Sequence, residues 1–100
     1  MKAEIFDQYV DRVVDIFKIS REELFLKDRR RVYSDARYLL YYLCHIRPMK
    51  YIDIQRYMSG NGYEVSHAPI INAVKSIKER IKYDKDYIDI VKEIQKSVSI

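Results

Sequence analysis

The run from Tyr38 to Cys44 is apolar without interruption, and no other feature limits the fold of this chain as strongly. Its seven residues are far fewer than the ~20 that span a bilayer. Ser34 supplies an N-cap before the run and Pro48 stops the pattern after it, so we predict a helix from residue 35 to about residue 47. A helix that is apolar nearly all round belongs at the centre of a domain, covered by other elements.

Apolar residues recur at helical spacing through most of the remaining sequence, and only 2 Gly and 2 Pro interrupt it. The further helices expected from this pattern are Ala3–Lys18, a short helix capped by a Ser20–Glu23 box, Met49–Met58 with Ile52, Ile54 and Met58 buried, His67–Lys82 with Ser66 as N-cap, and a last helix capped by Asp84 that buries Tyr87, Ile88, Val91, Ile94 and Val98. The predicted fold class is therefore all-α, a compact bundle of about six helices that forms a single domain over residues 1–100.

The net charge of +4 is concentrated in the middle of the chain. Residues 27–58 carry +5 and residues 59–83 carry +2, whereas residues 1–26 carry −2 and residues 84–100 carry −1. A basic middle segment suits a polyanion such as nucleic acid, and it also fits a solvated surface with no ligand. The charge distribution alone leaves both interpretations open.

The helix 49–58, the glycine-containing turn 59–62 and the helix 67–82 together have helix-turn-helix character. In such a unit the second helix enters the major groove of DNA, where its exposed face meets base edges and phosphates. The same pattern also fits two ordinary packed helices with a solvated polar face.

Four residues of the predicted recognition helix and its N-cap are candidate DNA contacts. Asn72 suits adenine, because its amide pairs with N6 and N7 together, and Lys75 suits phosphates. Ser66 and His67 lie at the helix N-terminus, which itself attracts a phosphate.

The second candidate DNA-binding segment is a basic loop over residues 27–31, and Arg37 follows it on the central helix. Consecutive arginines suit a phosphate backbone or a narrow minor groove, and the same residues also fit a flexible, solvated turn. The residues of this segment expected to contact DNA are Lys27, Arg29, Arg30, Arg31 and Arg37.

Three stretches of the sequence match the motif pattern of one known family. Residues 27–44 run from basic residues through Arg37 into an apolar helix, residues 54–58 read Ile-Gln-Arg-Tyr-Met, and residues 67–73 read His-Ala-Pro-Ile-Ile-Asn-Ala. These stretches resemble the C-terminal DNA-binding domain of the bacterial replication initiator DnaA, and the similarity covers roughly residues 4–97. The family's signature D-H-T-T-V-L-H-A shares its histidine and its final alanine with this chain, and its arginine before the apolar helix aligns with Arg37.

The resemblance implies a Trp-repressor-like helix-turn-helix fold, here as a stand-alone domain, and a role in DNA replication or transcription regulation. Ser66, Ala68 and Pro69 replace the aspartate and the two threonines of the signature, and Val65 replaces an arginine. Since those positions help that family to read the DnaA box, the resemblance extends to the fold and to DNA binding but not to the preferred sequence. The family's ATPase module is not implied, because the sequence contains no G-x-x-x-x-G-K-[ST] motif.

Nothing in the sequence indicates an enzyme or a metal protein. The single cysteine, Cys44, is followed directly by His45, and adjacent helical residues project about 100° apart, which suits neither a metal site nor a nucleophile pair. We therefore expect no catalytic activity, no cofactor, no metal, no membrane association and no small-molecule substrate.

Two functions remain open from the sequence. The first is double-stranded DNA binding in the cytoplasm, associated with the nucleoid. The alternative is a helical protein–protein interaction or scaffold module that kept the fold and lost DNA binding, with a protein as its partner.

Overall fold

The computed structural model describes residues 2–98, and over that range it contains six α-helices and no strand. The helices are α1 (Lys2–Phe17), α2 (Arg21–Leu24), α3 (Arg31–Ile46), α4 (Tyr51–Gly60), α5 (His67–Ile81) and α6 (Lys85–Ser97). The predicted all-α class and the number of helices are confirmed. None of the described helices is long and apolar enough to cross a membrane.

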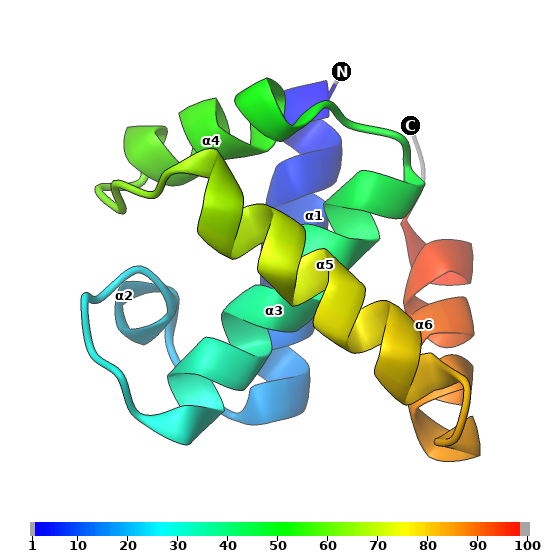
Figure 1. The fold of residues 1–100 in the computed structure, drawn as a ribbon. Coiled ribbons are helices and arrows are strands. Elements are labelled where there is room, and N and C mark those ends of the chain that lie inside the picture. Colours follow the sequence, from blue (N-terminus) through cyan, green and yellow to red (C-terminus); the bar gives the residue numbers. More distant parts are fainter. Residues whose placement is uncertain (1, 99–100) are drawn as a thin grey trace.

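The central position predicted for the apolar run is also confirmed. In Figure 1, α1 lies behind α3 and α5 crosses in front of it, and these two pairs make the most extensive helix contacts. Leu39, Leu40 and Leu43 of α3 are each exposed by 1% or less. Because a fully buried Leu side chain stabilises the fold by about 1.5–3 kcal/mol, this helix supplies a large part of the hydrophobic driving force.

The helix α3 begins at Arg31, four residues before the predicted start at residue 35, and the prediction of Ser34 as N-cap is wrong. Ser34 lies within the first turn, where its amide donates to the carbonyl of Arg30 at 3.0 Å. The earlier start places Tyr33 in the interior, and its hydroxyl donates to the Glu23 carboxylate at 2.6 Å. Burial of this side chain outweighs the local capping preference of a serine.

Two of the predicted N-caps make their capping hydrogen bonds, and a third residue occupies its predicted N-cap position without one. The Ser20–Glu23 capping box is complete, and the Asp84 carboxylate accepts from the amide of Tyr87 at 3.1 Å. Ser66 occupies the N-cap position of α5, but its side chain accepts no hydrogen bond from the described part of that helix. The N-terminus of α5 therefore keeps amide groups that no side chain caps.

Two residues predicted to be buried lie nearer the surface. Ile52 is 42% exposed and Ile88 is half-buried, whereas Ile54 and Met58 are fully buried as predicted. The helix α4 begins at Tyr51, two residues later than expected, and Ile52 lies about 200° around it from the buried Ile54.

Within residues 2–98, Arg37 is the only buried charged side chain, at 5% exposure. Its guanidinium donates to three backbone carbonyls at and after the end of α2, those of Leu24 at 2.9 Å, Leu26 at 3.2 Å and Asp28 at 2.9 Å. Leu24 is the last residue of α2 and the other two residues lie beyond it, so helix hydrogen bonds do not satisfy these carbonyls. Arg37 therefore holds an irregular segment against the central helix.

We predict that Arg37→Lys lowers the free energy of unfolding by about 2–4 kcal/mol, because one ammonium cannot reach carbonyls that the planar guanidinium reaches from two nitrogens. Urea denaturation followed by circular dichroism measures this loss. Arg29→Lys, on an exposed arginine nearby, is the control and should stay within about 0.5 kcal/mol of the parent. Equal stability of the two variants would contradict a structural role for Arg37.

The two N-caps yield a second prediction. Asp84→Ala should cost about 1 kcal/mol of unfolding free energy, because it removes a capping hydrogen bond, whereas Ser66→Ala should cost less than about 0.5 kcal/mol. Asp84→Asn distinguishes the contribution of the cap from that of the 3.5 Å ion pair with Arg80, because the amide oxygen of Asn can accept the capping hydrogen bond but carries no charge. The assignment of the caps is wrong if Ser66→Ala destabilises the protein as much as Asp84→Ala.

Candidate nucleic-acid interface

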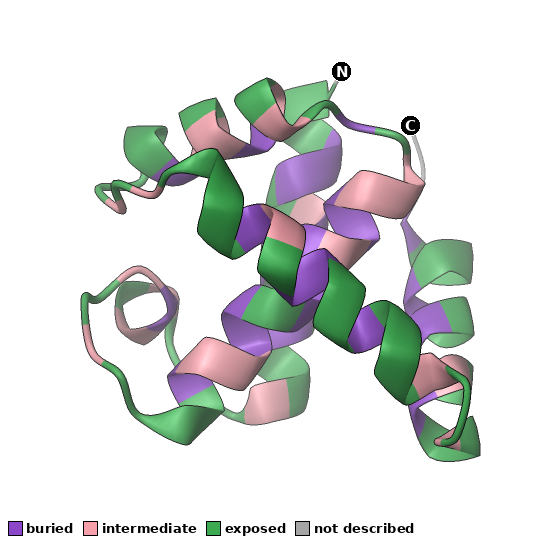
Figure 2. Ribbon diagram, in the orientation of Figure 1, coloured by how far each residue is buried: buried purple, intermediate pink, exposed green. Residues whose placement is uncertain are grey.

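The helix α5 turns one side to the core and the other to solvent, as Figure 2 shows. Its inward side consists of Ile70, Ala73, Val74 and Ile77. Asn72 and Lys75, the two candidate contacts on the body of this helix, are exposed. Since no acidic partner contacts Lys75 in the described chain, its ammonium is available to a phosphate.

The N-terminus of α5 is open to solvent and lies beside a row of aromatic rings. Ser66 and His67 are both exposed. The His67 ring lies 6.4 Å from the ring of Tyr51, which in turn stacks on His45 at 5.5 Å with an interplanar angle of 6°. Burial and, to a lesser extent, the charge of Lys78 hold the pKa of His45 below its ordinary value, which favours the neutral ring.

The three consecutive arginines lie at the surface, at the end of the segment that Arg37 holds. The side chain of Arg31 is 93% exposed and that of Arg30 is 71% exposed. Each has a weak acidic neighbour, Asp35 at 3.8 Å from Arg31 and Asp28 at 3.4 Å from Arg30. Arg29 is exposed and has no ion pair among the described residues. These guanidinium groups are therefore accessible to a polyanion.

Two of the expected contact residues are engaged within the protein instead. The burial of Arg37 leaves its guanidinium no access to DNA, so the expected contact from this residue does not fit the structure. The ammonium of Lys27 donates to the carbonyl of Glu64 and lies 4.2 Å from the centre of the Tyr63 ring. In the sequence all basic residues of this segment are equivalent. In the fold, Arg37 and Lys27 make contacts within the protein, whereas the three consecutive arginines extend into solvent.

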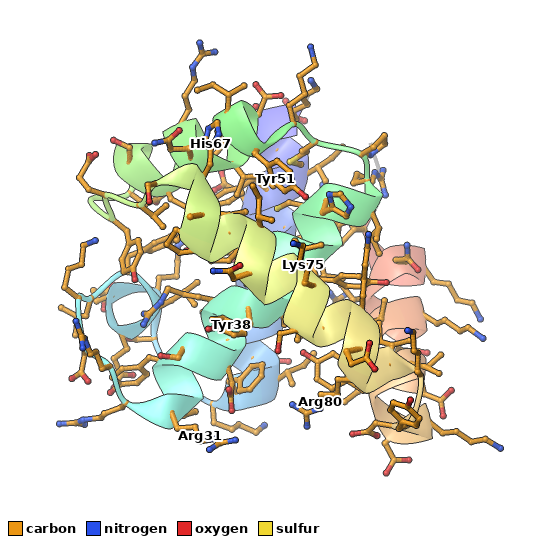
Figure 3. The ribbon with its side chains drawn as sticks, viewed as in Figure 1. Arg31, Tyr38, Tyr51, His67, Lys75 and Arg80 are labelled. Carbon is orange, nitrogen blue, oxygen red and sulfur yellow. The ribbon has the colours of Figure 1, made fainter. Side chains whose placement is uncertain are left out.

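A groove brings residues of α3 and α5 together, and it adds residues that the sequence does not single out. It has a volume of about 400 Å³ and is lined by Arg31, Asp35, Tyr38, Ser76, Ile77, Arg80 and Tyr87. Figure 3 shows Arg31, Tyr38, Lys75 and Arg80 on the same side of the molecule. The sequence does contain a pattern that indicates Arg80. It follows Asn72 and Ser76 at intervals of four residues, and residues four apart lie along one side of a helix.

Arg80 is held at the edge of this groove by two contacts. Its guanidinium lies 4.5 Å from the centre of the Tyr87 ring, and its Nε lies 3.5 Å from Asp84. Burial raises the pKa of Tyr87 to about 12, so the ring stays neutral and its face is available to the cation. The side chain of Arg80 remains 52% exposed, which leaves its charge accessible.

The acidic groups of the chain ends lie on other elements. Asp7 and Asp11 on α1 pair with Arg21 at 3.2 and 2.8 Å. Asp15 on α1 and Glu93 on α6 line a separate groove between those helices. In Figure 1, α1 lies behind α3 and α5 lies in front of it, so the central helix separates the acidic groups of α1 from α5.

The described residues contain no cluster of three or more His, Cys, Asp or Glu side chains arranged to hold a metal ion. Cys44 is fully buried, and this burial raises the pKa of its thiol well above the ordinary range. The ring of the neighbouring His45 stacks on Tyr51.

No known protein family has a model that matches this sequence, and no curated protein sequence is significantly similar to it.

Proposed function

We propose that this chain binds double-stranded DNA, with α5 in the major groove and the basic segment 27–31 against the adjoining sugar–phosphate backbone. The observation that carries the proposal is the position of Arg31 and Arg80 on one groove, beside the exposed side of α5. Exposed cations on one side supply the sequence-independent attraction to phosphates, and polar side chains on a helix supply contacts to base edges.

In this proposal α4, residues 61–66 and α5 act as a helix-turn-helix, with α5 as the recognition helix. The N-terminus of α5, at Ser66 and His67, receives a backbone phosphate, because its uncapped amides and the helix dipole favour an anion. Asn72 faces the bases one turn further along, and Lys75 and Arg80 contact phosphates on either side.

The proposed biological role is control of replication or transcription by a stand-alone domain with the DnaA C-terminal, Trp-repressor-like fold. The motif resemblance supports this role, and so does the buried helix that follows the basic segment. The substituted residues Ala68 and Pro69 are both exposed at the start of α5, where they offer no side-chain donor to a base. We therefore propose a target sequence different from the DnaA box.

A protein partner in place of DNA is the second candidate, and exposed apolar side chains favour it. Leu26 is 48% exposed, Val32 is 38% exposed and Ile52 is 42% exposed. These residues lie on separate elements, and single exposed apolar residues are common on protein surfaces, so we rank this candidate second.

Replacement of Arg29, Arg30 and Arg31 together by Ala should weaken binding to every duplex by about ten- to a hundredfold at moderate salt. The slope of log K against log salt should fall by about 2–3 units, because each lost phosphate contact releases one counterion fewer. Fluorescence anisotropy with a labelled random-sequence duplex, titrated with salt, measures both quantities.

The matched control replaces Arg12 of α1 and Lys92 and Lys96 of α6 by Ala, which changes the net charge equally on other elements. This control should leave affinity within about threefold of the parent, since charges beyond the contact surface are largely screened. Equal losses in the two triple variants would mean that net charge alone drives binding. A parent protein that binds no duplex at low salt would refute the proposal and favour the protein partner.

Asn72 and Lys75 should differ in what they contribute. We expect Asn72→Ala to reduce discrimination between preferred and random sites by about 1–3 kcal/mol, because a bidentate contact to adenine is lost. Lys75→Ala should weaken all sequences similarly and lower the salt slope by about one unit.

Selection of bound sequences from a randomised duplex library, with each variant, tests this difference. The placement of α5 is wrong if Asn72→Ala and the parent enrich the same motif equally strongly. Ser76→Ala is a useful comparison, because Ser76 lies one turn beyond Asn72 on the side that borders the groove.

A further inference from the structure

A cation–aromatic–cation stack joins the two proposed DNA-binding segments. Tyr63 lies in the connection between α4 and α5, and two cations lie over its ring, the ammonium of Lys27 at 4.2 Å and the guanidinium carbon of Arg37 at 4.8 Å from the ring centre. Both separations lie within the range of a cation–π interaction. We propose that Tyr63 is a positioning residue for DNA binding, which sets the basic segment at a fixed place relative to α5; this inference rests on the proposed function.

Each end of the stack is anchored in a different part of the chain. Arg37 is buried on α3 and holds the carbonyls of Leu24, Leu26 and Asp28. Lys27 lies within the same segment, and its ammonium also donates to the carbonyl of Glu64. The stack thus ties residues 24–28 both to the central helix and to the connection before α5.

The connection that carries Tyr63 is itself ordered by local hydrogen bonds. The amide of Tyr63 donates to the carbonyl of Met58 at 3.0 Å, and the side chain of Asn61 donates to the carbonyl of Tyr57 at 2.8 Å. Gly62 has a φ of +85°, a conformation that glycine adopts without strain. The hydroxyl of Ser59 donates to the Glu64 carboxylate at 2.5 Å. Tyr63 is therefore presented from a fixed turn.

The stack leaves the three consecutive arginines free to bind DNA. Arg29, Arg30 and Arg31 continue directly from the held residues and remain exposed. A segment already ordered before binding loses less conformational entropy on contact with DNA than a mobile one. Tyr63 acts on affinity through the position of these arginines and makes no contact with DNA itself.

The first measurement needs no DNA. Trypsin cleaves after Arg29 and Arg30 only when the segment opens locally, so the rate at which fragments ending at these two residues appear, followed by mass spectrometry, reports its order. We expect Tyr63→Leu to raise that rate by about tenfold, and Tyr63→Phe, which keeps the ring, to match the parent. Tyr83→Leu is the control, since Tyr83 is 81% exposed and lies on the connection between α5 and α6.

The second measurement is duplex affinity in two backgrounds. In the parent background Tyr63→Leu should weaken binding by about five- to tenfold, whereas in the Arg29, Arg30 and Arg31 triple-Ala background it should change affinity by less than about twofold. A loss of the same size in both backgrounds would mean that Tyr63 acts through general stability, and it would overturn the positioning role. The melting temperature of each variant identifies any that fails to fold.

Lys27→Met keeps the stack between Tyr63 and Arg37 and supplies a second variant if Tyr63→Leu unfolds. It should reproduce the faster cleavage and the background-dependent loss of affinity, and parent-like behaviour in both would refute the inference. If the parent binds no duplex, the proposed function and the positioning role fail together. The cleavage rates would still decide whether the stack orders the segment.

Discussion

The buried guanidinium of Arg37 is the interaction on which the arrangement of this protein depends. It brings three backbone carbonyls, from the last residue of α2 and the irregular segment after it, onto the central helix and so compensates polar groups that would otherwise lie unpaired near the core. The five donors of a guanidinium in fixed directions suit this task, and no other side chain offers them. Because this contact holds residues 24–28, it determines where the arginines that follow reach the surface.

The same contact divides the basic residues of the middle segment into two groups. Arg37 is buried among carbonyls and the exposed Lys27 contacts Tyr63 and Glu64, whereas Arg29, Arg30 and Arg31 extend into solvent. Net charge per segment therefore overstates the charge that a partner meets. Arg31 and Arg80 nevertheless line one groove, together with Asp35, although they are far apart in the sequence.

The sequence predicted the parts of the fold that periodicity determines, and it failed where tertiary contacts override local preference. The six helices and the buried position of α3 followed from apolar spacing and from caps such as Asp84. The start of α3 at Arg31 did not follow, since burial of Tyr33 outweighs the capping preference of Ser34. The inward direction of Arg37 was not predictable either, because its partners are backbone carbonyls, which no residue pattern marks.

The start of α5 indicates where sequence discrimination must come from if this helix enters the major groove. Ala68 and Pro69 are exposed there, and neither has a side-chain donor or acceptor for a base edge. Backbone amides at a helix N-terminus attract phosphates of any sequence. Direct discrimination by α5 then falls to Asn72 and Ser76, which lie one turn apart on the side that leads toward the groove shared with α3. A footprint centred further along α5, and closer to the basic segment, is the arrangement that these side chains allow.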